Sequence, residues 1–193
     1  MRLFIALEID EAIRTRIARF LDGVRGFAPD ARWERPESLH ITLKFIGEQS
    51  EENVENIKRA LETITADHFE INVRGYGFFP GARMPRVFWI GIEASAELTS
   101  LAATVDEKSS GLGIPREEHA FSPHLTLARG GAGSPRKQKS DRPNRSFQHL
   151  QEKLAALPAP EFGTMTAREF FLYRSQLSPS GSKYTKLAGF VLH

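Results

Sequence analysis

Two short polar motifs contain the residues of this sequence that are best suited to chemistry. The pattern His-x-Thr-Leu occurs at residues 40–43 and again at residues 124–127. In each copy apolar residues flank the polar ones with a period of two, which predicts a strand with one buried face and with His and Thr together on the other. Two such polar pairs in a chain of 193 residues indicate a shared cleft.

A pair of imidazoles can divide acid and base work between them. Their ordinary pKa of about 6.5 lets the pair hold one proton near neutral pH, so that one acts as general acid and the other as general base. This suits in-line displacement at phosphorus, in which a deprotonated water attacks and the departing oxygen is protonated. The hydroxyls of Thr42 and Thr126 would donate hydrogen bonds to the non-bridging phosphate oxygens.

Arg129 follows the second motif and would supply a cation for the same phosphate. Strict alternation puts its side chain on the core side of the strand. A bulge or an early strand end, permitted by the following Gly130-Gly131, would turn it back toward the histidine. The same alternation predicts that the core-facing residues of the two strands are Leu39, Ile41, Leu43 and Phe45 in the first and Phe121, Leu125 and Leu127 in the second.

The elements that must position these motifs repeat along the chain. A strand, a helix and a His-containing strand are predicted over 3–8, 10–25 and 39–46, and again over 86–92, 97–112 and 121–128. This order favours a degenerate duplication. It predicts an α+β fold with two pseudo-symmetric lobes of mostly antiparallel sheet and outer helices around a central cleft. We expect residues 1–193 to form a single two-lobed domain.

The remaining segments are predicted from local patterns. Helices are expected from residue 50 to 64 and from 147 to 157, a strand at 69–73, a Gly- and aromatic-rich loop at 75–81, a flexible basic insert at 130–145, and final strands around 167–174 and 184–192. Solvent-facing or purely structural roles are expected for Arg14, Arg16 and Arg19 on the first helix, and for His68, His119, His149 and His193. Candidates for stacking on a base are Phe4, Trp33 and the 75–80 loop.

Composition excludes several classes of protein. Without cysteine there is no disulfide, no thiolate nucleophile and no cysteine-ligated zinc. The net charge of +2 means that any basic surface must be local. No apolar run approaches the length that crosses a bilayer, and residues 3–7 are too short for a signal segment. We therefore expect a cytoplasmic protein without a membrane partner.

Taken together, these motifs resemble the two-histidine (2H) phosphoesterase superfamily, specifically the bacterial RNA 2′,3′-cyclic phosphodiesterases once called 2′-5′ RNA ligases. The resemblance spans essentially the whole chain. Besides the two His-x-Thr-Leu motifs it includes Arg2-Leu3-Phe4-Ile5-Ala6-Leu7, Pro85-Arg86-Val87-Phe88-Trp89-Ile90-Gly91, and Leu172-Tyr173-Arg174-Ser175-Gln176-Leu177-Ser178 with Gly181 and Tyr184.

The resemblance implies a V-shaped cleft and opening of a 2′,3′-cyclic phosphate to a 2′-phosphomonoester, without metal or other cofactor. It makes His40 the proton donor to the 3′ oxygen and His124 the base that activates water. It makes Thr42, Thr126 and Arg129 the substrate contacts. The expected partners are RNA ends or nucleotides bearing a 2′,3′-cyclic phosphate, and the expected state is a monomer. Run backwards with a 5′-hydroxyl, the same chemistry would form a 2′-5′ linkage without ATP.

Two other interpretations remain open at this point. In a zinc hydrolase the two histidines would be metal ligands, but such a site normally has three protein ligands, and no Asp or Glu lies on the His-Thr face of either strand. In a non-catalytic RNA-binding module the basic insert and the aromatics at 76–79 would bind RNA. A zinc hydrolase would lose its activity on chelation. An RNA-binding module would bind RNA equally well after loss of His40 or His124.

Overall fold

The computed structural model of this chain describes residues 1–130, 145–178 and 181–193. Within these residues the strands are β1 (Arg2–Glu8), β2 (Arg32–Trp33), β3 (His40–Glu48), β4 (Phe69–Phe79), β5 (Val87–Ala94), β6 (His124–Arg129), β7 (Glu161–Ala167), β8 (Glu169–Ser178) and β9 (Gly181–Val191). The helices are α1 (Glu11–Val24), α2 (Glu51–Glu62), α3 (Ala96–Ser110) and α4 (Arg145–Ala155), with short 3-10 turns η1 (Arg25–Phe27) and η2 (Pro36–Ser38). None of the helices in these three ranges is both apolar enough and long enough to cross a bilayer.

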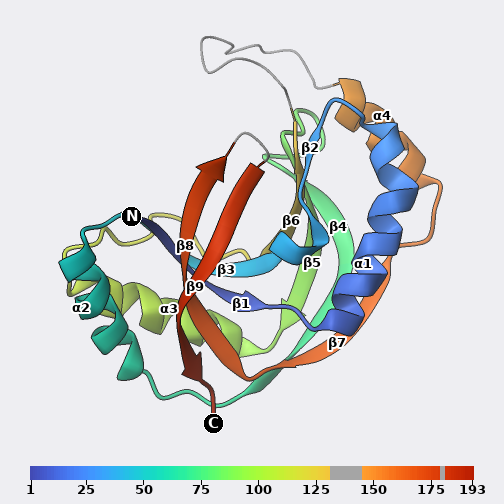
Figure 1. The fold of residues 1–193 in the computed structure, drawn as a ribbon. Helices are drawn as coiled ribbons and strands as arrows, with labels where there is room; N and C mark the ends of the chain where they lie inside the picture. The colour runs from blue at the N-terminus through green and yellow to red at the C-terminus, as the bar shows by residue number, and fades with distance from the viewer. Residues whose placement is uncertain (131–144, 179–180) are drawn as a thin grey trace.

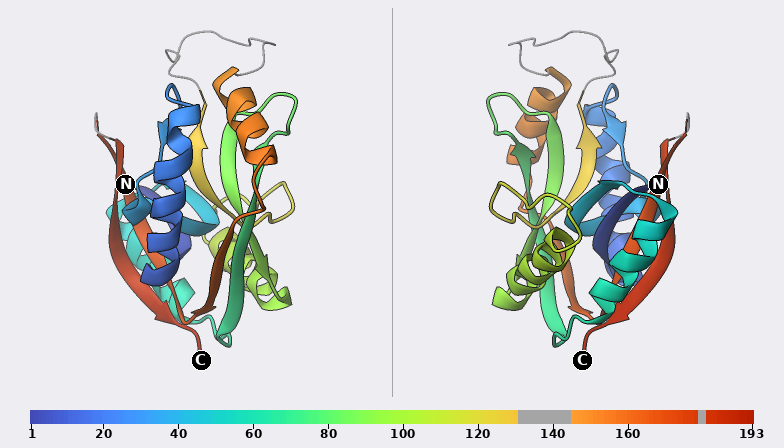
Figure 2. Two further views of the ribbon diagram at one scale, coloured as in Figure 1. Left: turned by 90° about the vertical axis from the view of Figure 1, so that its right-hand side faces the viewer. Right: turned by 90° about the vertical axis from the view of Figure 1, so that its left-hand side faces the viewer.

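The strands form two antiparallel sheets. One sheet has four strands in the order β3-β1-β8-β9, and the other has five in the order β2-β6-β5-β4-β7. The two sheets stand next to each other, with α1 and α4 on one flank and α2 and α3 on the other (Figure 1). In the side views the four-stranded sheet, with β9 in red, lies on one side of the molecule, and the five-stranded sheet, with β4 in green, lies on the other (Figure 2). The expected α+β class with antiparallel sheets and outer helices is confirmed.

The predicted duplication has a clear structural counterpart. Each His-containing strand pairs with the strand that opens its own repeat: β3 pairs with β1, and β6 pairs with β5. The helix of each repeat, however, contacts the opposite sheet: α1 contacts β7, and α3 contacts β3. This exchange of helices ties the two halves together, and β3 and β6 are themselves in contact.

One continuous core lies beneath both sheets. Ile5 of the four-stranded sheet, Phe88 of the five-stranded sheet and Ile17 of α1 are completely buried in the same apolar cluster. Since apolar burial is the main favourable term in folding, separating the sheets would expose much of this surface. The core therefore fixes the orientation of β3 relative to β6.

The later segments differ from the prediction in two places. The Gly-rich stretch expected to be a loop continues β4 to Phe79, because Gly77 has no side chain to collide with the indole of Trp89, which lies across it from β5. The strand expected around 167–174 is β8, and the strand before it, β7, was not predicted; only Arg168 separates the two. Most of the predicted basic insert lies outside the described residues.

Candidate active site

The first His-Thr pair lies on β3, at the edge of the four-stranded sheet. His40 and Thr42 are half-buried, and their neighbours across β1 are Glu8 and Ala6. Residues two apart on β1 project from the same face, so His40 and Thr42 share a face as predicted. Leu39, Ile41 and Leu43 are buried, which confirms their predicted core positions.

A bulge follows this pair and changes the alternation. Leu43 has no partner on β1, because Thr42 pairs with Ala6 and Lys44 with Ile5. Lys44 is thereby turned into the core, and Phe45 shares the face of His40 and Thr42 with 60% of its surface exposed. The prediction that Phe45 faces the core was wrong, because the bulge at Leu43 reverses the sides of Lys44 and Phe45.

The second pair lies on β6 and is followed by the same irregularity. His124 pairs with Gly91 and Thr126 with Trp89, but Leu127 is skipped and Arg129 pairs with Val87. Gly91, Trp89 and Val87 alternate along β5, so the side chain of Arg129 shares the face of His124 and Thr126. Of the two devices considered for Arg129, the structure contains the bulge. Leu125 and Leu127 are fully buried, and Phe121 is half-buried.

Both imidazoles are held by the same local contact. Nδ1 of His40 lies 2.7 Å from the carbonyl oxygen of Ser38, and Nδ1 of His124 lies 2.7 Å from that of Ser122. A carbonyl can only accept, so Nδ1 must be the protonated nitrogen that donates. In each ring Nε2 is left as the nitrogen that can gain or lose a proton at a substrate.

Aromatic rings enclose each histidine. His40 packs against Phe4 at 4.7 Å between ring centroids and edge-to-face against Tyr184 at 5.2 Å. His124 packs edge-to-face against Phe79 at 4.9 Å and lies 6.3 Å from Trp89. These apolar walls exclude water from one side of each imidazole, which strengthens any charge interaction made there.

Electrostatic effects link three of the predicted residues. Burial lowers the pKa of His40 below its ordinary value, the bond to Ser38 opposes this, and the charges of Arg129 and His124 lower it further. Burial also lowers the pKa of His124, again with a contribution from Arg129. Arg129 therefore acts on both imidazoles, one from each sheet, and the structure brings these three side chains together.

Two residues of this site were not predicted to take part. The carboxyl of Glu34, next to β2, has its pKa raised by burial, while Arg129 and Arg32 act in the opposite direction. Burial and the charge of Glu34 raise the pKa of Tyr184, whereas Arg129 and Arg2 lower it. The charge of Arg129 therefore acts on Glu34, which follows β2 of the five-stranded sheet, and on Tyr184, which is part of β9 in the other sheet. No motif in the sequence marks Glu34.

The three stacking candidates have different positions. Phe4 is 3% exposed beneath His40 and has no free face for a base. Trp33 packs against Phe88, and its indole N–H donates to the carbonyl of Ala28 at 2.9 Å, so its role is structural. Phe79, at the end of the Gly-rich stretch, contacts His124. The large exposed aromatic on the His40 face is Phe45.

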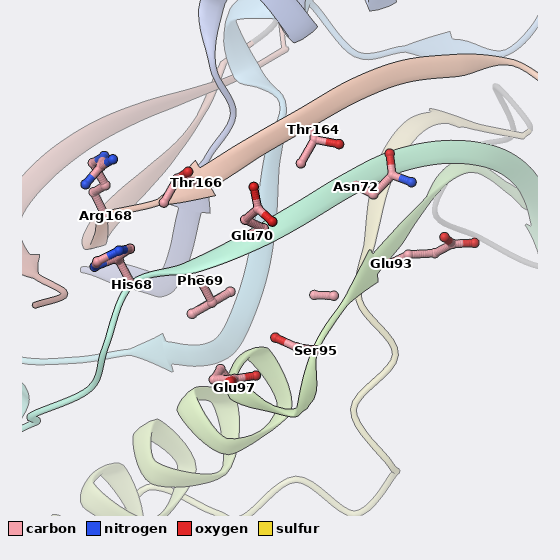
Figure 3. Close-up of a pocket in the computed structure, with 11 residues that line it drawn as sticks. His68, Phe69, Glu70, Asn72, Glu93, Ser95, Glu97, Thr164, Thr166 and Arg168 are labelled. Carbon is pink, nitrogen blue, oxygen red and sulfur yellow. The ribbon is translucent and has the colours of Figure 1, made fainter.

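A cavity of about 780 Å³ lies away from these residues (Figure 3). It is bordered by β4, β7, the end of β5 and the start of α3, and its carboxylates are Glu70, Glu93 and Glu97. Their negative charge makes it unsuited to a phosphate. His68 lines it and lies with Nδ1 2.9 Å from the carbonyl of His193, consistent with the structural role expected for it.

Among residues 1–130, 145–178 and 181–193, the histidine pair has no third side chain placed to complete a metal site. Over the three described ranges, no group of three His, Asp or Glu side chains is arranged to hold a metal ion. A catalytic zinc normally has three such ligands. The donor set around His40 and His124 is instead rich in hydroxyl and guanidinium groups, which are suited to an anion.

Comparison with known proteins agrees with this architecture. The model of the LigT-like phosphoesterase family matches the chain twice, over residues 7–89 and 90–184, so that each match contains one His-x-Thr motif. An RNA 2′,3′-cyclic phosphodiesterase of Archaeoglobus fulgidus is 36% identical over 190 residues, which cover 98% of this chain and 99% of the relative. That of Methanothermobacter thermautotrophicus is 32% identical over 194 residues, covering 100% and 99%.

Solved structures show the same fold. A Thermus thermophilus protein aligns with a TM-score of 0.79 at 30% identity, covering 100% of this chain and 98% of the other. Escherichia coli LigT in complex with 3′-AMP aligns with a TM-score of 0.77 at 25% identity, covering 99% and 97%. The fold and the paired histidines define a 2H phosphoesterase. The chain belongs to the LigT-like phosphoesterase family.

Proposed function

We propose that this protein hydrolyses the 2′,3′-cyclic phosphate of RNA ends to a 2′-phosphomonoester without a metal ion. The observation that carries the proposal is the matched pair of imidazoles, each with Nδ1 bonded to a backbone carbonyl and both under the charge of Arg129. The relatives named RNA 2′,3′-cyclic phosphodiesterase support the same substrate. A further support is that the family model matches each half of the chain around one histidine.

In this mechanism the two histidines have opposite roles. Nε2 of His124 takes a proton from water as the water oxygen attacks phosphorus. The bond from phosphorus to the 3′ oxygen breaks, and Nε2 of His40 gives its proton to that oxygen. The phosphate stays on the 2′ oxygen. Each turnover leaves His40 neutral and His124 protonated, so a proton must return to His40 before the next one.

The developing charge on the phosphate is met by Thr42, Thr126 and Arg129. The two hydroxyls lie one on each His-containing strand and would donate to the two non-bridging oxygens. The guanidinium of Arg129 adds a charge-assisted contact, which is about twice as strong as a neutral hydrogen bond. We assign these three residues to substrate binding.

We further propose that Phe45 stacks on the base of the terminal nucleotide. Its exposed ring is on the same face as His40 and Thr42, where a base attached to the bound ribose can reach it. Aromatic stacking accepts every base, because each has a π face. This predicts broad base tolerance.

The decisive experiment uses an oligonucleotide that ends in a 2′,3′-cyclic phosphate, incubated with the protein in excess chelator. We expect hydrolysis at full rate, with the phosphate found on the 2′ oxygen by digestion with a 3′-specific phosphatase and mass spectrometry. A 3′-phosphate product would contradict the proposed breakage of the bond to the 3′ oxygen, and loss of activity on chelation would point to a metal hydrolase.

Reverse ligation follows from the same geometry. A 5′-hydroxyl bound in place of water would attack phosphorus and displace the 3′ oxygen, joining the two ends through a 2′-5′ linkage without ATP. Incubation of a cyclic-phosphate end with a 5′-hydroxyl end annealed on a splint tests this. The expected product is a small fraction of joined strand that resists a 3′-5′-specific ribonuclease at the junction.

The non-catalytic alternative remains a distinct proposal for the same surface. A pure binding module would retain RNA affinity and show no turnover at any pH.

We also infer that residues 1–193 act as one two-lobed domain, which the core shared between the two sheets supports. We propose that this domain is a monomer and that it works in the cytoplasm. Size-exclusion chromatography with light scattering tests the monomer.

A further inference from the structure

Arg14 on α1 reaches away from its helix to the segment that precedes the first histidine. Its Nη1 donates to the carbonyl oxygen of Glu37 in η2 at 3.1 Å, and its Nη2 donates to that of Ile9 at 3.2 Å. Only 16% of its side chain is exposed, in contrast to the solvated helix face expected for it. The guanidinium therefore joins the start of α1 to the turn before β3.

This turn supplies the carbonyl that orients His40. Glu37 is bonded directly to Ser38, whose carbonyl oxygen lies 2.7 Å from Nδ1 of His40. A hydrogen bond at Glu37 O restrains the peptide plane between these two residues, and the turn's own bonds from Ser38 N–H to Arg35 O and from Leu39 N–H to Pro36 O make η2 move as one unit. If η2 shifts, the Ser38 carbonyl shifts with it.

We propose that Arg14 is a positioning residue for His40: by holding η2 in place, it keeps the Ser38 carbonyl on Nδ1–H and so keeps Nε2 of His40 available for proton transfer. The inference rests on the proposed acid role of His40 in cyclic-phosphate hydrolysis. Arg14 does not touch the substrate, so it acts only through His40.

The second histidine has a different tether, which makes it an internal control. The segment before β6 is held by Asp106 of α3, which accepts from the N–H of Glu117 at 3.1 Å, and by Lys44, which donates to the carbonyl of Pro115 at 2.8 Å. None of these contacts involves Arg14. Loss of Arg14 should disturb His40 and leave His124 unchanged.

Arg16, on the same helix, provides a matched control. Arg16 also donates to a backbone carbonyl, that of Phe162 on β7 at 2.8 Å, but this contact leads away from both histidines. Arg16→Met therefore removes the same kind of hydrogen bond and the same charge from α1. Its effect measures what loss of any such tether costs in stability.

The experiment compares Arg14→Met, Arg14→Lys and Arg16→Met. The tautomers of both imidazoles are read by 15N-detected NMR, and kcat and KM are measured on a cyclic-phosphate oligonucleotide. For Arg14→Met we expect His40 to become a mixture of tautomers, His124 to stay Nδ1-protonated, and kcat to fall about tenfold with KM within twofold. Arg14→Lys, which can keep one of the two bonds, should be intermediate, and Arg16→Met should match the wild type.

Two results would overturn the inference. One is an unchanged His40 tautomer in Arg14→Met with kcat equal to that of Arg16→Met. The other is an equal disturbance of His40 and His124, which would reveal a general loss of structure. If the wild-type protein proves inactive while His40 alone responds, the proposed function fails and the coupling of Arg14 to His40 stands.

Discussion

The two His-containing strands are alike in backbone and unlike in side chains. In both, Nδ1 is bonded to the carbonyl two residues earlier, and in both the leucine of the motif is the bulged residue. After the bulge, however, β3 turns Phe45 to the site and β6 turns Arg129. Duplication thus supplies two equivalent imidazoles. The second residue after each bulged leucine differs, so one half offers an aromatic ring to a ligand and the other offers a cation.

The residue that directly follows each bulged leucine differs as well. β6 turns the small Ala128 into the core, whereas β3 turns in Lys44, whose ammonium lies 2.5 Å from Asp106. A buried charge must be paired, so the four-stranded half depends on an ion pair where the other half needs only packing. The two halves should therefore respond differently to equivalent substitutions.

The largest expected effect is loss of either histidine. His40→Ala and His124→Ala should each lower kcat by about 10²–10⁴-fold, because each removes one proton transfer from the transition state. The double variant should fall little further than the worse single one, since residues that act as a unit are not additive. Circular dichroism should show an intact fold.

A substrate with sulfur in place of the bridging 3′ oxygen distinguishes the two roles. A thiolate is a good leaving group and needs no proton, so this substrate should restore much of the activity of His40→Ala and little of that of His124→Ala. Rescue of His124→Ala instead would reverse the assignment of acid and base.

The next effect concerns stability in the four-stranded half. Asp106→Ala should lower the free energy of unfolding by about 1–3 kcal/mol, because it leaves the ammonium of Lys44, which is 2% exposed, with only the Pro115 carbonyl at 2.8 Å and the Glu117 carboxylate at 4.0 Å. Adding Lys44→Met should recover part of this loss. Urea denaturation of the single and double variants measures it. A double variant that is less stable than Asp106→Ala would show that Lys44 is stabilised by other contacts.

Alternation and duplication were enough to predict the described strands other than β2 and β7, the fold class, and the shared face of His40 with Thr42 and of His124 with Thr126. The bulge at Leu43 could not be predicted, because Lys44 stands between the apolar Leu43 and Phe45 and so continues the period-two pattern without interruption. Phe45 was therefore assigned to the core. In β6 strict alternation would have buried the charged side chain of Arg129, and the glycines that follow it indicated that a bulge could turn it to the other face.

Long-range contacts set the other limit. Arg14 lies at a position of α1 that is polar by helical periodicity, and only the fold brings η2 against it, 23 residues later. Glu34 likewise becomes part of the site because β2 pairs with β6 next to Arg129. No local pattern in a single sequence encodes such pairings.

Substitution of the two residues after the bulges should separate phosphate binding from base binding. Arg129→Ala should lower kcat/KM by about 100-fold for every cyclic phosphate, since it removes a charge-assisted contact.

Phe45→Ala should raise KM about tenfold for nucleotides, because it removes one stacking platform. A base-free ribose cyclic phosphate should be unaffected by Phe45→Ala, with Phe45→Leu as the control for packing. Equal effects of Phe45→Ala on both substrates would contradict stacking.

The smallest effect is on the pH dependence. Arg129 lowers the pKa of both imidazoles, so Arg129→Met should raise both and move the bell-shaped profile of kcat/KM to higher pH. Arg2→Met, which removes a charge near Tyr184, should move neither. NMR titration of the two imidazoles measures each pKa directly.

The same shifts have a consequence for stability. The unfolded chain protonates these histidines near pH 6.5, whereas the folded protein keeps them neutral to lower pH. Just below pH 6.5 the unfolded state therefore binds more protons, and stability falls as the pH drops through this window. Arg129→Met should reduce that fall, because the pKa values of His40 and His124 in the folded variant should lie closer to 6.5. A fall of the same size in the variant and the wild type would mean that Arg129 does not act on the two imidazoles together.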